Sequence, residues 1–161
     1  MATVFDVAAY IVEKKSPMTT FKLQKLVYYS QAWSLVWDEK PIFEEEIQAW
    51  ANGPVVYELF DYYRGRYGIS EKPEMGDVGE LNDTEIETID IVLATYGDLS
   101  GRSLSQLTHS EDPWKIARGN IPDTEISNNS ITLASMAEYY SALDTAEEAV
   151  DVGDLNWIWS E

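Results

Sequence analysis

Apolar residues recur every three or four positions along most of the chain, which is the period of an α-helix. Threonine, proline and glycine residues that commonly begin or end helices bound several of these runs. The spacing predicts helices over residues 3–14, 20–37, 84–96, 103–110, 113–118 and about 131–143. The pattern therefore predicts a mainly α fold.

The segment 20–37 has apolar residues around most of its helical circumference. Leu23 and Leu26 share one face of the helix, and Tyr29 and Trp33 share a neighbouring face. A helix with so little polar surface is expected to be covered by other helices. We therefore expect a single compact helical domain built around this central, buried helix.

Residues 42–50 fit a strand and a helix about equally well. Apolar and polar residues alternate there, but three consecutive glutamates would also suit the first turn of a helix. We interpret this segment as one small β element. Pro54 is then expected in the first turn of a helix that reaches about residue 64, where its missing N–H group costs nothing. Residues 65–82, with four glycines and one proline, are expected to form an exposed loop.

The end of the chain differs in composition from the rest. Residues 144–161 carry six acidic residues and no basic one, and include the apolar sequence Trp157-Ile158-Trp159. We therefore divide the chain into a helical domain, residues 1–143, and an acidic, tryptophan-containing tail, residues 144–161. The tail either folds back over the domain or becomes ordered on a partner, and the sequence leaves both alternatives open.

Net charge is the most unusual property of the composition. The chain has 11 basic and 29 acidic residues, a net charge of −18 at pH 7. Residues 1–66 contribute only −2 of this charge, and residues 67–161 contribute −16. Such a charge repels phosphate backbones and anionic lipids, so it disfavours nucleic-acid and membrane binding. A solubilising surface and an acidic face that attracts a basic partner both remain as explanations.

Few catalytic chemistries fit this composition. The chain has no cysteine and a single histidine, which removes thiolate catalysis, Ser-His-Asp triads and multi-histidine zinc sites. If a catalytic focus exists, it is His109 with Glu111 and Asp112. The alternative is a structural His109 whose ring hydrogen bonds hold the turn at residues 110–113. We expect no enzyme, no catalytic residue, no cofactor and no metal site.

The sequence also bears on location. No apolar run approaches the roughly 20 residues that cross a bilayer, and the first residues lack the basic region and cleavage site of a signal peptide. The absence of cysteine fits a reducing compartment without proving one. We therefore expect a cytoplasmic protein.

Three segments have a more specific residue choice than amphipathic helices require. They are residues 20–33 (TFKLQKLVYYSQAW), 47–56 (IQAWANGPVV) and 104–114 (LSQLTHSEDPW). In this order and at these separations they resemble the Panacea domain, also described as the SocA-like antitoxin domain and found in phage-associated GepA-like proteins. The resemblance runs from about residue 18 to the helix around residue 140.

The resemblance implies an antitoxin of a two-gene toxin–antitoxin system that neutralises its cognate toxin by direct protein–protein contact. It also implies an alternative, because one branch of the family acts as an adaptor that delivers its toxin to an ATP-dependent protease. A second alternative follows from the net charge. It is a phage-encoded inhibitor or DNA mimic that occupies the nucleic-acid-binding groove of a host protein.

The motif residues and the tail tryptophans fall into two groups. Residues whose polar or amphipathic ends a core does not need are candidates for the partner interface: Lys22, Gln24, Lys25, Tyr28, Tyr29, Trp50, His109, Trp157 and Trp159. The others are expected to be structural, in the core or at a helix start: Leu23, Leu26, Trp33, Gly53, Pro54, Val55, Pro113 and Trp114. For the two lysines, internal ion pairing remains open as an alternative to an interface role.

Overall fold

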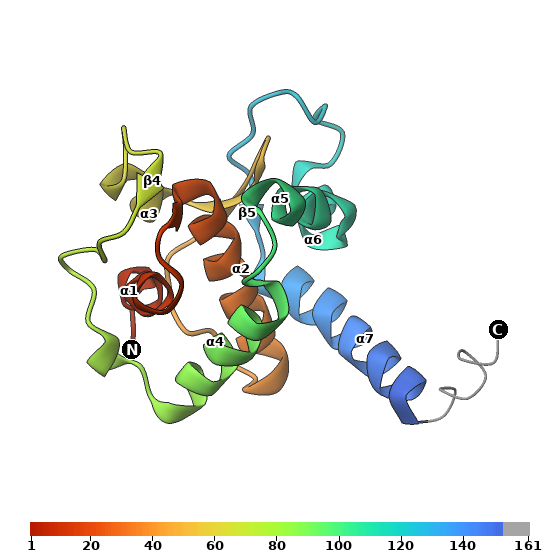
Figure 1. Ribbon diagram of the computed structural model, residues 1–161. Coiled ribbons are helices and arrows are strands. Elements are labelled where there is room, and N and C mark those ends of the chain that lie inside the picture. Colours follow the sequence, from red (N-terminus) through yellow and green to blue (C-terminus); the bar gives the residue numbers. More distant parts are fainter. Residues whose placement is uncertain (153–161) are drawn as a thin grey trace.

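Helix α2 (Thr20–Trp37) runs through the middle of the protein, and the other long helices pack around it (Figure 1). The computed structural model describes residues 1–152. The other helices in this range are α1 (Val4–Lys15), α3 (Tyr57–Tyr62), α4 (Asp83–Tyr96), α5 (Gly101–Ser110), α6 (Asp112–Arg118), α7 (Leu133–Val152) and the short 3-10 helix η1 (Val78–Glu80). The strands there are β1 (Met18–Thr19), β2 (Ile47–Trp50), β3 (Gly53–Val56), β4 (Gly68–Ile69) and β5 (Ser130–Ile131). This architecture confirms the predicted mainly α fold class.

The central position of α2 follows from its side chains. Twelve consecutive residues, from Leu23 to Ser34, are buried, so every face of this stretch contacts protein. The Thr19 side chain caps the helix by accepting a hydrogen bond from the Lys22 N–H group at 3.0 Å. The buried Gln31 amide is also satisfied, because it donates to the Phe43 carbonyl at 2.8 Å. The prediction of a central helix over residues 20–37 is confirmed.

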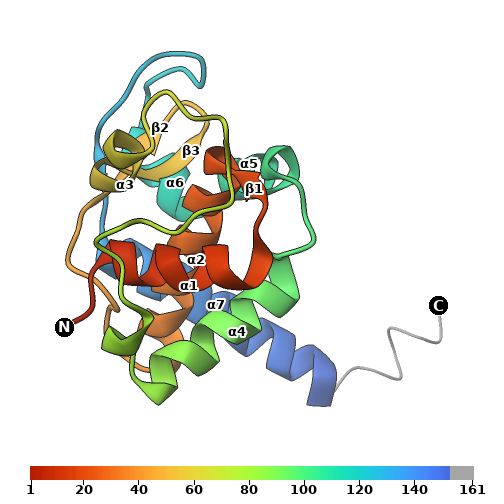
Figure 2. The ribbon, with the colours of Figure 1, turned by 60° about the vertical axis from the view of Figure 1, so that its left-hand side comes forward.

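The helices around α2 begin where their capping residues stand. In α4, the Glu85 N–H group donates to the Asn82 side chain at 2.8 Å, and the Asn82 N–H group donates to the Glu85 carboxylate at 2.9 Å. In α1, the Asp6 carboxylate accepts from the Thr3 N–H group at 2.8 Å. Figure 2 shows α1 lying across α2, with α4 alongside.

The helix predicted from Pro54 to about residue 64 is present only as α3, Tyr57–Tyr62, because residues 53–56 form strand β3. This strand pairs antiparallel with β2, with Trp50 opposite Gly53 and Ile47 opposite Val56. The sheet order is β3-β2-β5, so Pro54 lies in an edge strand, where prolines are tolerated. The opposite residue, Ala49, donates its N–H group to Asn129 instead. The small β element predicted near residues 42–50 is present only over β2.

Two other segments differ from the predictions. The loop at residues 65–82 contains β4, which pairs with β1, and the helix η1. Helix α7 continues to Val152, beyond the predicted end near residue 143, because alanine and glutamate in this stretch favour a helix even without an apolar stripe. No helix of residues 1–152 is both long enough and apolar enough to span a bilayer.

Candidate partner-binding site

The three sequence motifs meet at the N-terminal half of α2. The Gln24 amide bridges the first motif to the second: it donates to the Val56 carbonyl at 3.1 Å and accepts from the Val56 N–H group at 2.9 Å. The third motif joins the second through the Trp114 indole, which donates to the Trp50 carbonyl at 2.8 Å. These side chains therefore fix the β2–β3 hairpin between α2 and α6.

Lys25 is buried at the centre of this junction. Its Nζ atom donates to the Pro54 carbonyl at 3.2 Å and lies 4.3 Å from the centroid of the Phe21 ring. Burial lowers the pKa of the Lys25 amine to about 7, because charging it there costs solvation that the protein does not replace. The close approach also requires Gly53, since a Cβ atom at that position would lie 2.6 Å from Lys25 Cε.

A second buried cluster surrounds Glu111. Its carboxyl group accepts hydrogen bonds from Tyr29 at 2.6 Å and from Tyr140 at 2.8 Å, and the Tyr28 and Tyr140 hydroxyl groups lie 3.0 Å apart. The Tyr29 ring stacks on Tyr96 with a centroid separation of 4.0 Å. Burial raises the pKa of Glu111 despite the two tyrosine hydrogen bonds, which act in the opposite direction. The cluster ties α2 to α4, α7 and the start of α6.

A cavity of about 440 Å³ opens beside the motif junction. It is lined by α2, the β2–β3 turn, α3 with the residues after it, and residues 126–128, and we call it the α2–α3 pocket. Its walls include the rings of Phe21, Trp50 and Phe60, and Trp50 and Phe60 meet edge to face at 4.9 Å. Ile126 lies at its rim with 94% of its surface exposed. The pocket therefore presents an apolar interior to solvent.

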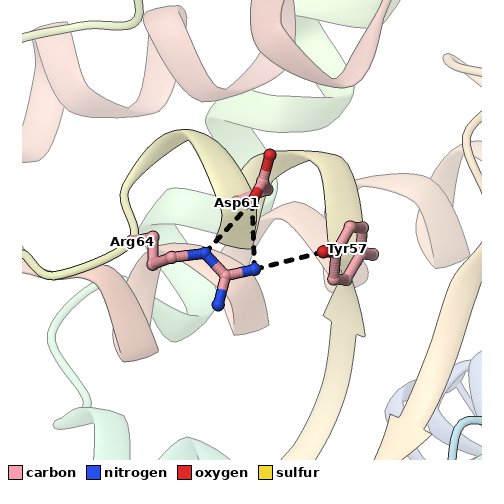
Figure 3. Close-up of polar contacts among 3 residues, drawn as sticks. All are labelled: Tyr57, Asp61 and Arg64. Carbon is pink, nitrogen blue, oxygen red and sulfur yellow. Dashed lines mark hydrogen bonds and ion pairs between the residues drawn. The ribbon is translucent and has the colours of Figure 1, made fainter.

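The charges around the α2–α3 pocket are opposite in sign to those of the whole chain. Lys25, Arg64 and Arg66 line it, and no aspartate or glutamate is among its 18 described lining residues. Arg64 pairs with Asp61 at 3.0 Å and donates to the Tyr57 hydroxyl at 3.1 Å (Figure 3). Among residues 1–146, Lys25 and Arg66 make no ion pair with a carboxylate. Since Asp61 pairs with Arg64 and burial lowers the pKa of Lys25 to about 7, Arg66 is the cationic group that this pocket offers to a ligand.

The structure brings only some of the interface candidates to this pocket. Gln24, Lys25 and Trp50 line it, although the first two are buried. Lys22 points elsewhere and donates to the Gly97 carbonyl at 2.6 Å. Tyr28 and Tyr29 are buried in the Glu111 cluster. Trp157 and Trp159 lie outside the described residues, and the interface roles of all these side chains stay predictions.

The structural candidates share one environment. Every one of them is buried within the protein: Leu23, Leu26, Trp33, Gly53, Pro54, Val55, Pro113 and Trp114. Within residues 1–146 the two lysines do not pair with carboxylates, and Lys22 and Lys25 both donate to backbone carbonyls instead. Backbone oxygens therefore take the place of the acidic partners that the composition suggested.

His109 has a different role from the turn-holding one considered for it. Its ring stacks on Trp114 with a centroid separation of 4.0 Å, and its buried Nε2 atom has no hydrogen-bond partner among the described side chains and backbone. The turn is held instead by backbone and hydroxyl groups, including the Glu111 N–H group, which donates to the Thr108 carbonyl at 3.2 Å. Burial lowers the pKa of His109, so the ring favours its neutral form.

The chemical focus considered at residues 109–112 is not assembled. Glu111 is held by the tyrosines, and the exposed Asp112 pairs with Lys115 at 3.7 Å. Across the described part of the chain, no three histidine or acidic side chains gather closely enough to hold a metal ion.

Sequence reasoning missed Arg64, Arg66, Phe60 and Ile126, which lie outside the three motifs. The sequence Arg64-Gly65-Arg66 carried one usable signal, because Lys14-Lys15 is the one other pair of basic residues so close together in a chain of this charge. Nothing in the sequence connected them to residues 126–128, which approach them only in the folded protein.

Residues 23–115 match the family described as "Antitoxin SocA-like, Panacea domain". The match covers more than half of the chain and includes most of α2, the β2–β3 hairpin and α5, so the chain belongs to this family. It is 30% identical over 122 residues to Antitoxin SocA of Caulobacter vibrioides (strain NA1000 / CB15N). That alignment covers 68% of this chain and 64% of the relative's length. No solved structure matches the chain.

Proposed function

We propose that this protein is the cytoplasmic antitoxin of a two-gene toxin–antitoxin system and that it neutralises its cognate toxin by direct protein–protein binding. The observation that carries this proposal is the family match over residues 23–115, which contains nearly all of the three motifs. The name of the relative, Antitoxin SocA, supports the same role. Neutralisation by occlusion of a toxin surface needs neither a cofactor nor turnover.

The burial of the motifs indicates which residues stabilise the fold and which are free to contact a toxin. Leu23, Leu26 and Trp114 stabilise the fold, and Gln24 and Lys25 fix the hairpin. The motifs therefore act as a scaffold, and the contact with the toxin falls to exposed side chains that the scaffold positions. Large exposed apolar side chains at the α2–α3 pocket and beside it on the chain include Ile126, Tyr57 and Tyr67, and such groups favour association.

Co-expression with the product of the neighbouring open reading frame tests the proposal. That product alone is expected to arrest growth, and this protein is expected to restore growth and to co-purify with it. Light scattering after size-exclusion chromatography would give the mass of the complex and hence its stoichiometry. Absence of both rescue and co-purification would contradict the proposal.

The same experiment separates occlusion from delivery to a protease. An occluding antitoxin leaves the amount of toxin unchanged or raised, whereas an adaptor lowers it. We expect the toxin to persist in complex with the antitoxin. Toxin that disappears only when both this protein and an ATP-dependent protease are present would favour the adaptor alternative.

One observation favours a second candidate, the DNA mimic. Residues 67–161 contribute a net charge of −16, and clustered carboxylates can imitate a phosphate backbone. A DNA mimic would compete with duplex DNA for a host nucleic-acid-binding protein and would need no toxic neighbour. Rescue of a neighbouring toxin without such competition would decide for the antitoxin.

A further inference from the structure

We propose that the α2–α3 pocket binds a segment of the toxin that carries a large apolar side chain next to a carboxylate. The inference rests on the proposed function and specifies the chemistry of one contact within it. Three features of the pocket support it: its charge, its apolar walls, and the way in which those walls are held.

Charge selects an acidic segment for this position. Most of the protein repels carboxylates, because the chain has 29 acidic residues against 11 basic ones. The α2–α3 pocket has no acidic residue among its described lining side chains and has three basic ones, of which Arg64 is paired with Asp61 and Lys25 is fully buried. Of these, Arg66 is exposed and is available to a ligand. Its Cζ atom lies 5.9 Å from the centroid of the Tyr62 ring and 5.8 Å from that of the Tyr63 ring. A guanidinium group can bind a carboxylate through two parallel hydrogen bonds.

The walls select an apolar side chain beside that carboxylate. The volume of about 440 Å³ lies within the range of roughly 300–1,000 Å³ of pockets that bury ligand groups. Phe21, Trp50 and Phe60 supply aromatic surface inside, and Ile126 stands at the rim with 94% of its surface exposed. Covering this surface would remove apolar area from water, which favours binding.

The pocket wall on α3 is held in place before any ligand arrives. The Arg64 guanidinium lies 5.1 Å from the centroid of the Phe60 ring while it bonds Asp61 and Tyr57 (Figure 3). Arg64 is therefore a positioning residue, because its charge is already paired with Asp61. Arg66 supplies the charge at the rim that no carboxylate of residues 1–146 pairs with. Because the wall is already ordered, binding to it loses less conformational entropy.

The rest of the molecule argues that the occupant comes from a partner. Figures 1 and 2 show α3 and the loop after α6 in the upper half of the molecule, whereas α7 descends and ends at the opposite side. The C-terminal end of α7 therefore lies away from the elements that form the α2–α3 pocket.

A pair of small probes tests the chemistry without the toxin. N-acetyl-tryptophan carries an indole and a carboxylate, and N-acetyl-tryptophanamide is its neutral analogue. In titrations followed by nuclear magnetic resonance, the acid is expected to shift the amide signals of Asn52, Gly65 and Ile126 at lower concentration than the amide does. Arg66→Gln is expected to remove this difference, and the exposed Arg102→Gln, the matched control on α5, is expected to keep it. Equal shifts by both probes, or no shift at these residues, would overturn the proposal.

The toxin itself supplies the second test. Arg66→Gln and Ile126→Ser are both expected to weaken the complex by roughly tenfold or more, and Arg102→Gln is not. All three exposed variants are checked by circular dichroism for an unchanged fold. Wild-type protein that fails to bind the toxin would remove the proposed function itself. Wild-type affinity in both pocket variants would leave that function standing and would overturn only the pocket assignment.

A synthetic peptide with the sequence of residues 153–161 addresses the main competing occupant, because it also combines tryptophans with acids. The peptide is expected to compete with the toxin only weakly. A peptide that binds the α2–α3 pocket in an Arg66-dependent way, while the toxin tolerates Arg66→Gln, would assign the pocket to the tail of this chain and overturn the proposal.

Discussion

At the scale of single residues, the main finding is that polar side chains of the motifs form hydrogen bonds inside the fold. Lys25 and Gln24 looked like surface residues in the sequence, because a core does not need an amine or an amide. The structure shows that both side chains are buried, because the β2–β3 hairpin turns backbone groups of Pro54 and Val56 toward α2, and these groups need partners. Residue type alone does not reveal a backbone carbonyl that arrives from another element.

Lys25 makes stability depend on pH in a defined window. Its pKa is about 7 in the folded protein and about 10.4 in an unfolded chain, so the unfolded state binds more protons between these values. Stability is therefore expected to rise with pH from about 7 to about 10, by at most about 1.4 kcal/mol per pH unit. The pKa values of Tyr28 and Tyr29, which burial raises, oppose this only above about pH 10. His109 titrates below the window, because burial lowers its pKa.

Urea unfolding of wild type and Lys25→Met at several pH values in this window measures the effect. The free energy of unfolding of the wild type is expected to rise with pH relative to that of Lys25→Met. Lys22→Met is the control, because its amine lies on the partly exposed side of α2 and should leave the slope of the wild type unchanged. If the free energy of unfolding changed with pH in the same way for wild type and Lys25→Met, the pKa of the Lys25 amine would not be lowered in the folded protein.

The buried tryptophans give a second residue-scale prediction. Trp33 and Trp114 are 5% and 2% exposed, and both indoles donate internal hydrogen bonds. Truncation of either to alanine is expected to cost about 3–5 kcal/mol and to reduce toxin binding only through loss of fold. Trp37→Ala, at a position that is 37% exposed, should cost much less. Unchanged thermal melts with lost binding would place Trp33 or Trp114 in the interface instead.

At the scale of elements, helices were predictable where the signal is local. The capping residues and the apolar period of α1, α2 and α4 lie within each segment, and these helices begin and end within about one residue of prediction. The β2–β3 hairpin was missed because Pro54 suits a helix start and an edge strand equally well. Residues 53–56 form a strand because they pair with β2 and bond to Gln24 of α2, and the local sequence around Pro54 does not reveal either contact. The same reason hid Arg66 and Ile126, since the α2–α3 pocket is formed by segments far apart in the chain.

The hairpin turn yields a matched test at Gly53 and Gly65. Both residues have positive φ angles, +120° and +85°, so alanine is strained at either position. A Cβ atom at Gly65 meets nothing within 4 Å, whereas one at Gly53 lies 2.6 Å from Lys25 Cε. Gly65→Ala is expected to cost about 1–2 kcal/mol, and Gly53→Ala distinctly more. Chemical denaturation measures both, and equal costs would mean that Lys25 moves aside freely.

At the scale of the whole molecule, the charge distribution separates two steps of binding. The acidic residues, which lie largely in 67–161, attract a basic partner over a distance, whereas the α2–α3 pocket binds a segment of that partner by direct contact. A toxin with a basic surface would be attracted by the first and would insert an acidic, apolar segment into the second. Long-range attraction is screened by salt, because the Debye length falls from about 10 Å at 0.1 M to about 3 Å at 1 M.

These two steps predict different kinetic responses. The association rate is expected to fall as salt rises, and the dissociation rate, set by buried contacts, is expected to change less. Neutralising acids of the tail, with Glu147→Gln, Glu148→Gln and Asp151→Asn combined, should slow association more than it speeds dissociation. Arg66→Gln should speed dissociation more than it slows association, because it removes a direct contact and changes the long-range electrostatic attraction little. Surface plasmon resonance at several salt concentrations measures both rates for each variant.

An association rate that does not change with salt concentration would mean that the charge of −18 serves solubility alone. Recognition would then rest on contacts such as those at the α2–α3 pocket.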